Sequence, residues 1–248
     1  MKYLLIVFFL MAFSGTPPAE TTTIFEETNY PTSWSTTKKR ATEIHEGHEI
    51  TIYCGCEYTP KGASGGVIDH STCEFLNRPN ISDTRAVRLE WEHIVPASLM
   101  PAREHSCWID GSRSECERNG PPEIKAMIFD LHNLVPSVGQ VNADRSNLRY
   151  GEIEGEVLVF GRCDFEYSRE LGIAEPAPEV RGDVARVWFY MRDTHGVVFT
   201  PGEEEMFQEW SEGDPVGEWE IERNRRIYCE QGTFNSYISD GSFKCGGE

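Results

Sequence analysis

The segment RAVRLEWEH, residues 85–93, alternates hydrophobic and polar positions with the two-residue period of a β-strand. Pro96 follows soon afterwards and cannot donate a ladder hydrogen bond, so we expect this strand to end near His93. A second extended segment is predicted around HNLVP, residues 132–136. The middle of the chain is therefore expected to contain short strands.

Helical periodicity dominates the C-terminal part of the chain. In GDVARVWFYMRDTHG, residues 182–196, apolar side chains recur at helical spacing, and Gly196 is a typical C-terminal stop. Four more helices are expected in PPEIKAMIF, VGQVNADRSN, PGEEEMFQEW and PVGEWEIERNRRIYC, residues 121–129, 138–147, 201–210 and 215–229. These patterns predict an α+β fold, a single mixed domain with several helices and short strands.

Other segments are less regular. KKRATEIHEGHEI, residues 38–50, predicts a short helix, and TIYC, residues 51–54, predicts a strand. The glycine-rich stretch GASGGVID, residues 62–69, predicts a loop. Residues 101–121 are polar and contain two cysteines, so we expect a disulfide-bounded insertion there.

The first residues have the pattern of a secretory signal peptide. Lys2 precedes the apolar run at residues 4–13, and small residues permit cleavage after residue 14 or 19. We assign residues 1–19 to the signal peptide, 20–45 to a mobile Thr- and Pro-rich leader with a short helix, and 46–248 to the main domain. This organisation predicts a secreted or periplasmic protein with no membrane span in the mature chain.

The chain has eight cysteines, and an even number in an exported protein favours disulfides. Cys107 and Cys116 flank a polar loop, and Cys229 and Cys245 bracket the C-terminal segment, so each pair is a candidate local bridge. Zinc is disfavoured, because no CxxC pairs complete a thiolate site. We expect the pairs Cys54–Cys163, Cys56–Cys73, Cys107–Cys116 and Cys229–Cys245, although the sequence leaves other connectivities open.

The charge is unevenly distributed along the chain. The formal net charge is −18, and hydrophobic residues make up 39%, which is ordinary for a folded domain. Residues 78–149 contain nine Lys/Arg and ten Asp/Glu, whereas residues 150–222 contain five and nineteen. The middle segment is therefore nearly neutral, and the overall acidity does not exclude a polyanionic partner for it.

Candidate chemistry begins with Glu92 and His93. A carboxylate is a good ligand for Mg²⁺ or Ca²⁺, and an imidazole near neutral pH is a good proton acceptor. Adjacent strand residues point to opposite faces, so both serve one site only if the chain leaves the strand there. By themselves these residues also fit an ordinary strand end, with a solvated glutamate and a hydrogen-bonded histidine.

The segment DLHNLVPSVGQVNADRSN, residues 130–147, favours the chemical interpretation. Asn142 lies inside a predicted helix, where asparagine is unfavourable. Its amide oxygen is a hard neutral ligand, so metal binding would explain an asparagine at this position. Asn133, by contrast, lies in the predicted extended segment.

Together, EWEHIVPA and DLHNLVPSVGQVNADRSN resemble the endonuclease I family of exported bacterial nucleases, which belong to the ββα-metal (His-Me finger) nucleases. The similarity extends to YCGC, CWIDG, RVWFYMRD and EWEIERNRRI, in the same order along the chain. It covers most of the chain from about residue 50. The resemblance therefore implies a disulfide-stapled domain with a ββα-metal finger core.

The resemblance also implies a role for each matched residue. His93 would be the general base that deprotonates a water for in-line attack on phosphorus. Glu92 and Asn142 would hold one divalent cation, Mg²⁺, for which Ca²⁺ or Mn²⁺ could substitute. Asn133 would brace the finger, and Arg103 would hold the cleaved phosphate. The products would be oligonucleotides with 5′-phosphates.

The implied substrate is DNA, together with RNA, cut without sequence preference because phosphate contacts carry no base information. The first candidates for contact with nucleic acid are Arg85, Arg88, Arg145 and Arg149. A complete positive groove would be assembled from Arg85, Arg88, Arg103, Arg113, Arg118, Lys125, Arg145 and Arg149. We expect a monomer that does not bind membranes.

Two alternatives remain. A cell-wall glycoside hydrolase could use Glu90 and Glu92 as its acid pair, but this leaves His93 and Asn142 unexplained. An inactive acidic binding module on the same fold is disfavoured because Glu92, His93 and Asn142 are all present.

Four disulfides would also make activity depend on oxidation after export.

Overall fold

The computed structural model describes residues 28–62, 65–78, 83–155 and 157–246. The predicted signal peptide, residues 1–19, lies outside the described residues. One cluster of buried hydrophobic side chains extends from Ala41 to Ile227, so the described chain is a single α+β domain, as predicted. None of the described helices has the length and apolar character needed to cross a bilayer.

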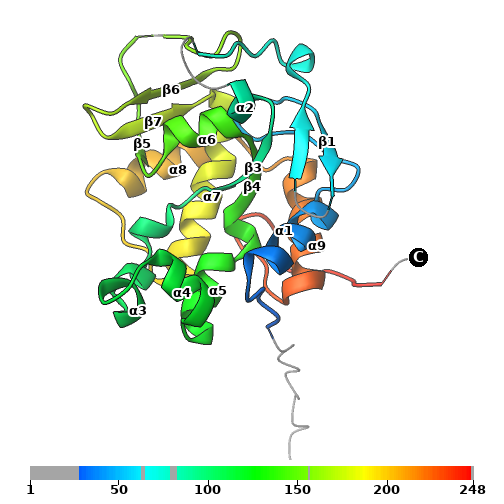
Figure 1. The fold of residues 1–248 in the computed structure, drawn as a ribbon, viewed down its shortest axis with the longest axis vertical. Helices are drawn as coiled ribbons and strands as arrows, with labels where there is room; N and C mark the ends of the chain where they lie inside the picture. The colour runs from blue at the N-terminus through cyan, green and yellow to red at the C-terminus, as the bar shows by residue number, and fades with distance from the viewer. Residues whose placement is uncertain (1–27, 63–64, 79–82, 156, 247–248) are drawn as a thin grey trace, which may run out of the picture.

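Two antiparallel strands lie near the centre of the fold (Figure 1), β3 (Leu89–His93) and β4 (Leu134–Val138). They pair along their whole length. Helix α6 (Gly139–Arg145) follows β4 directly. The predicted strand that ends at His93, the second extended segment and the helix after it are all confirmed.

Residues 94–133, between the two strands, form a series of short helices. These are η2 (Ala97–Leu99), η3 (Pro101–Glu104), α3 (Ser106–Ile109), α4 (Arg113–Asn119), α5 (Pro122–Phe129) and η4 (Leu131–Asn133). The predicted helix α5 begins at a proline, whose missing N–H would have no partner in a first turn. The polar insertion at residues 101–121 contains η3, α3 and α4.

The N-terminal part packs against this centre. Its elements are α1 (Trp34–Ile44), β1 (Tyr58–Lys61), β2 (Gly65–Ile68), η1 (His70–Thr72) and α2 (Asp83–Ala86). Helix α1 contacts α9 (Glu218–Gln231) and, through Trp34, the ring of Phe129 in α5. The short helix expected in the leader is therefore packed into the domain.

Two predictions in this region were wrong. Residues 51–54 form a turn instead of a strand, because the backbone of Thr51 bonds to Gly55 and Cys56 and closes the chain on itself. Residues 65–68 form strand β2 instead of a loop. A Cβ at Gly66 would meet Leu89 at 3.2 Å, so the missing side chain allows the β1–β2 hairpin to lie close to β3.

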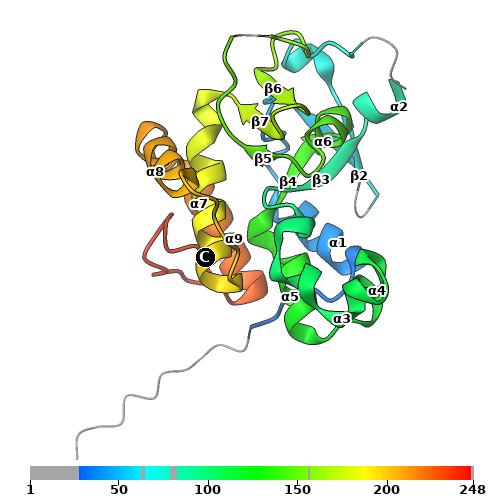
Figure 2. The ribbon, with the colours of Figure 1, turned by 90° about the vertical axis from the view of Figure 1, so that its left-hand side faces the viewer.

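The C-terminal part contains a three-stranded sheet and the long helices. The strands, in the order β5-β7-β6, are β5 (Arg149–Tyr150), β7 (Ile173–Pro176) and β6 (Phe165–Ser168). The helices are α7 (Pro178–His195), α8 (Glu203–Gly213) and α9, all as predicted. Gly196 ends α7 in the left-handed conformation, at a φ of 72°. In Figure 2 these helices lie on the side opposite α2 and α6.

Four disulfides connect these parts, and all four expected pairs are present: Cys54–Cys163, Cys56–Cys73, Cys107–Cys116 and Cys229–Cys245. The first joins positions 109 residues apart and ties the N-terminal segment to the region before β6. The third joins α3 to α4 within the insertion.

Candidate active site

A cleft of about 840 Å³ opens beside β3. All five residues of this strand, 89–93, border it. Since neighbouring side chains of a strand point to opposite faces, the cleft must run along the edge of β3. Glu92 and His93 thus share one cleft while both remain in the strand. The rest of its border is formed by Trp34, Lys38, Arg85, Arg88, Pro96, Ala97, Ser98, Trp108, Arg113, Asn142, Ala143, Arg145, Ser146 and Asn147.

His93 is buried, and its Nε2 lies 2.7 Å from the carbonyl oxygen of Ile128. A carbonyl oxygen only accepts, so Nε2 carries the proton and Nδ1 is the basic nitrogen. The ring of Trp34 packs edge-to-face against the imidazole, with ring centroids 5.5 Å apart. Burial, assisted by the charge of Arg113, lowers the pKa of His93 to about 3. The imidazole is therefore neutral at physiological pH.

Glu92 is buried beside Arg145 of α6. Nη1 of Arg145 donates to Oε1 of Glu92 at 2.9 Å, and the Tyr53 hydroxyl donates to the same oxygen at 3.5 Å. Burial raises the pKa of Glu92 to about 7, although the charge of Arg145 opposes this shift. Both contacts use Oε1, so neither occupies Oε2.

Arg145 does not lie on the surface as a contact for nucleic acid would. Its side chain is buried, and it also donates to the backbone carbonyl oxygens of His93, at 2.6 Å, and of Ile94. It therefore holds the end of β3 against α6. The side chain was expected among the residues that contact the substrate, but packing turns it inward.

Asn142 of α6 borders the cleft and contacts Glu90. Its Nδ2 donates to Oε2 of Glu90 at 3.0 Å. Glu90 also accepts from Arg85, at 2.9 and 2.6 Å, and from Arg88, at 2.7 Å. The same cleft thus offers a carboxylate from Glu92 and an amide from Asn142, a donor set of the kind that Mg²⁺ prefers.

Asn133 is buried beneath the turn that follows β3. Its Oδ1 accepts from the backbone N–H of Val95 at 2.7 Å, and its Nδ2 donates to the carbonyl oxygen of Val95 at 3.0 Å. The backbone carbonyl of Asn133 also accepts from Ile94 at 3.1 Å. Asn133 therefore holds the turn next to His93, and it does not border the cleft.

Arg103 and Arg113 differ in their relation to the cleft. Arg103 is exposed on η3, with Nη1 3.5 Å from the carbonyl oxygen of Ser98, and it does not border the cleft. Arg113, at the start of α4, borders the cleft and lies over the ring of Trp34 at 5.7 Å. Of these two arginines, only Arg113 has a charge that contributes to the lowered pKa of His93.

The predicted positive groove is only partly assembled. Arg85, Arg88, Arg113 and the buried Arg145 border the cleft. Arg149 is turned toward Glu203 of α8, with contacts of 2.8 and 2.6 Å, and it lies outside the cleft. Arg103, Arg118 and Lys125 do not border it either. Five cationic side chains and two carboxylates still line the cleft, in contrast to the acidic chain as a whole.

Sequence reasoning missed Trp34 and Lys38, because they lie in the segment that was assigned to the leader. A tryptophan within a stretch of Ser and Thr is the one signal that could have identified this contribution. It also did not foresee the contact between Glu90 and Asn142.

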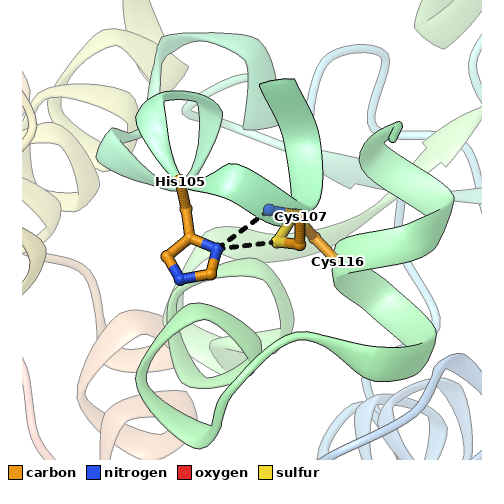
Figure 3. Close-up of side chains that lie close together, drawn as sticks. All are labelled: His105, Cys107 and Cys116. Atoms are coloured by element: carbon orange, nitrogen blue, oxygen red, sulfur yellow. Dashed lines mark hydrogen bonds between the residues drawn. A yellow bond between two sulfur atoms is a disulfide. The ribbon is translucent and has the colours of Figure 1, made fainter. Parts of the chain in front are cut away.

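His105, Cys107 and Cys116 lie close together outside the cleft (Figure 3). The two sulfurs are bonded to each other, so neither is a thiolate that could bind a metal. Nδ1 of His105 accepts from the backbone N–H of Cys107 at 3.1 Å and caps α3. This group is structural.

Comparisons with known proteins show which family this chain is similar to. The family model Endonuclease I matches residues 32–242. Endonuclease-1 of Buchnera aphidicola subsp. Acyrthosiphon pisum (strain APS) is 35% identical over 202 residues, which cover 82% of this chain and 78% of the relative. An extracellular deoxyribonuclease of Aeromonas hydrophila is 34% identical over 81% of this chain and 85% of its own. A periplasmic deoxyribonuclease of the same species is 35% identical over 81% and 83%.

The matched region contains every element that borders the cleft, including α1 with Trp34 and Lys38. It also contains Glu92, His93 and Asn142. Since the family model spans the domain from α1 to α9, this chain is a nuclease of the endonuclease I family.

Proposed function

We propose that this protein is an exported, metal-dependent endonuclease that hydrolyses phosphodiester bonds of DNA and RNA without sequence preference. The observation that carries the proposal is the hydrogen bond from His93 Nε2 to Ile128, which leaves Nδ1 as a base in the cleft shared with Glu92 and Asn142. The names of the extracellular and periplasmic relatives support export.

In this mechanism Nδ1 of His93 takes a proton from a water molecule as the water oxygen attacks phosphorus. The bond from phosphorus to the 3′-oxygen breaks and this oxygen takes up a proton from solvent, so the products carry a 5′-phosphate and a 3′-hydroxyl. Burial lowers the pKa of His93 to about 3, so its imidazole is neutral and Nδ1 carries no proton before the reaction. The contact with Ile128 fixes the tautomer of the neutral ring, with its proton on Nε2.

Glu92 and Asn142 would hold a divalent cation, Mg²⁺, through a carboxylate and an amide oxygen. When bound, the ion neutralises charge on the scissile phosphate and on the leaving 3′-oxygen. Arg145 keeps the Glu92 carboxylate in place from the buried side, with its contact at Oε1. The ββα-metal finger predicted from sequence would correspond to β3, β4 and α6, and Asn133 would brace it.

Arg113 supplies the guanidinium that would bind the cleaved phosphate, a role that the resemblance gave to Arg103. Arg113 borders the cleft, and its charge acts on His93. A phosphate attacked by a water that His93 deprotonates would therefore lie close enough to interact with Arg113, which supports this assignment. Arg85 and Arg88 would contact the flanking phosphates. Such contacts bind DNA and RNA alike and carry no sequence information.

The glycoside hydrolase alternative is disfavoured by the contacts of its acid pair. Both oxygens of Glu90 accept hydrogen bonds, from Arg85, Arg88 and Asn142, so neither faces a sugar substrate. Glu92 is paired with Arg145. A peptidoglycan assay is expected to show no turnover.

The test uses purified oxidised protein with plasmid DNA and, separately, with a structured RNA. Cleavage is expected with Mg²⁺, absent with EDTA, and lowered on the order of 10²–10⁴-fold in His93→Ala. His48→Ala, outside the cleft, is the control for loss of an imidazole. Cleavage that persists in EDTA would exclude the metal mechanism, and full activity of His93→Ala would exclude the base. End-labelling of the products tests for the 5′-phosphate.

A further inference from the structure

The hydrogen bond between Asn142 and Glu90 determines how the asparagine amide is oriented. Nδ2 of Asn142 donates to Oε2 of Glu90 at 3.0 Å. A carboxylate only accepts, so the NH₂ end must face Glu90 and the Oδ1 end must point away from it. An amide by itself has no such preference, because its oxygen and nitrogen ends are nearly equal in shape.

Glu90 is itself held in place. Arg85 binds both of its oxygens, Nε to Oε1 at 2.9 Å and Nη2 to Oε2 at 2.6 Å. Arg88 adds a contact from Nε to Oε1 at 2.7 Å. A two-pronged arginine contact restricts rotation of a carboxylate more than a single bond does. The acceptor that faces Asn142 is therefore fixed in position.

The backbone brings the two residues together at Gly139, where α6 begins. A Cβ added at Gly139 would lie 2.8 Å from Oε1 of Glu90 and 2.6 Å from the carbonyl oxygen of Arg85. These distances are too short for a side chain, so the glycine lets α6 start against Glu90. Asn142 follows one turn later and reaches the same carboxylate.

We infer that Glu90 is a positioning residue that presents the Oδ1 atom of Asn142 to a divalent cation. This inference rests on the proposed function, in which Asn142 and Glu92 hold that ion. It gives the two glutamates of the EWEH segment separate tasks: Glu92 contributes a ligand oxygen, and Glu90 orients the second ligand. Arg85 and Arg88 then act partly through Glu90.

The most direct test measures metal binding without nucleic acid. Mn²⁺ is titrated into the protein and followed by electron paramagnetic resonance, for the wild type and for Glu90→Gln. The introduced glutamine can offer either an oxygen or an NH₂ to Asn142, so the amide is free to turn. We expect the Mn²⁺ affinity to fall on the order of 10–100-fold, as for loss of other groups that orient metal ligands.

Arg88→Gln is the matched control. The side chain of Arg88 is 54% exposed, and its replacement leaves the contact between Glu90 and Asn142 in place. We expect its Mn²⁺ affinity to stay within about threefold of the wild type, as is usual for an exposed ion pair. Equal losses in Glu90→Gln and Arg88→Gln would overturn the inference, because Glu90 would then act only through its arginines.

A double variant separates orientation from general damage. In Glu90→Gln/Asn142→Asp the introduced glutamine can donate to the introduced carboxylate, which reverses the hydrogen bond and still supplies an oxygen ligand. Mn²⁺ affinity is expected to recover to at least the wild-type value, and cleavage at saturating Mg²⁺ to recover with it. A double variant that binds no better than Glu90→Gln would contradict the inference. Thermal unfolding followed by circular dichroism confirms that each variant is folded.

A different set of Mn²⁺-binding results would show that the proposed metal site itself is wrong. If the wild type shows no saturable Mn²⁺ binding, or if Asn142→Ala binds as the wild type does, then Asn142 is not a ligand and the proposed metal site is wrong. If Asn142→Ala loses affinity while Glu90→Gln keeps it, only the positioning role of Glu90 is overturned.

Discussion

The Nε2 atom of His93 lies 2.7 Å from the carbonyl oxygen of Ile128, at the C-terminal end of α5. This contact joins β3 to the insertion that follows it, and it determines which imidazole nitrogen is basic. Trp34, from helix α1, packs against the same ring. The orientation of His93 therefore depends on three separate segments of the chain.

Replacement of Trp34 by alanine is expected to change the pH dependence of cleavage. The pKa of His93 is about 3 mainly because the imidazole is buried, so exposing it raises that pKa toward 6.5. The base would then be protonated in mildly acidic solution, and activity at pH 5.5 relative to pH 8 would fall on the order of 10-fold further than in the wild type. Trp34→Phe, which keeps an aromatic ring, is the control. Parallel pH profiles for wild type and Trp34→Ala would contradict this role.

Arg113 and Arg103 can be distinguished by kinetics. Arg113→Ala is expected to lower kcat/KM on the order of 10²–10³-fold, because it removes the guanidinium in the cleft that is proposed to bind the phosphate. Arg103→Ala should have a much smaller effect, since Arg103 lies outside the cleft. Arg118→Ala controls for loss of one positive charge from the same insertion. A larger loss of kcat/KM in Arg103→Ala than in Arg113→Ala would assign the phosphate-binding role to Arg103.

The disulfide Cys107–Cys116 is expected to matter more for activity than its short span suggests. It closes a loop between α3 and α4 that carries Trp108 and Arg113 to the cleft. Cys107→Ser/Cys116→Ser should lose activity at temperatures well below its unfolding midpoint. Cys229→Ser/Cys245→Ser removes a bridge of similar kind outside the cleft, at a cost of about 2–4 kcal/mol in stability, and should keep its activity when folded. Equal specific activities of the two folded variants would refute this expectation.

The free energy of unfolding is expected to decrease in acid. Burial lowers the pKa of His45 to about 3 and that of His132 to about 4, from an ordinary value of 6.5. Below pH 6.5 the unfolded chain binds protons that the folded chain does not, so falling pH favours unfolding down to about pH 4. Each histidine contributes about 1.4 kcal/mol per pH unit in that range.

Urea unfolding at pH 7, 6 and 5 measures this slope. His45→Gln should reduce it by about one proton, because one of the three buried imidazoles with a lowered pKa, those of His45, His93 and His132, is gone. A slope as steep in the variant as in the wild type would contradict the assignment. Because His45 lies outside the cleft, the measurement is independent of catalysis.

Several features were predictable from local patterns. The alternation that ends at His93, the helical spacing in residues 182–196 and the stop at Gly196 all depend on interactions between neighbouring residues, and each element formed as expected. Two predictions failed where a distant contact overrides local preference. The strand predicted at 51–54 ends in a disulfide to Cys163, and residues 65–68 of the predicted loop pair with β1.

The sequence by itself determined the elements with a clear local pattern, namely the strand that ends at His93 and the helix that stops at Gly196. It left the connectivity of the cysteines open. Only the tertiary structure decided which side chains meet. Arg145 turns inward to Glu92, 53 residues away, because packing α6 on β3 buries both. Trp34 reaches His93 from the first helix, α1, and the charge of Arg113 acts on it from α4, in the insertion after β3. Such contacts depend on the packing of distant segments, which periodicity does not encode.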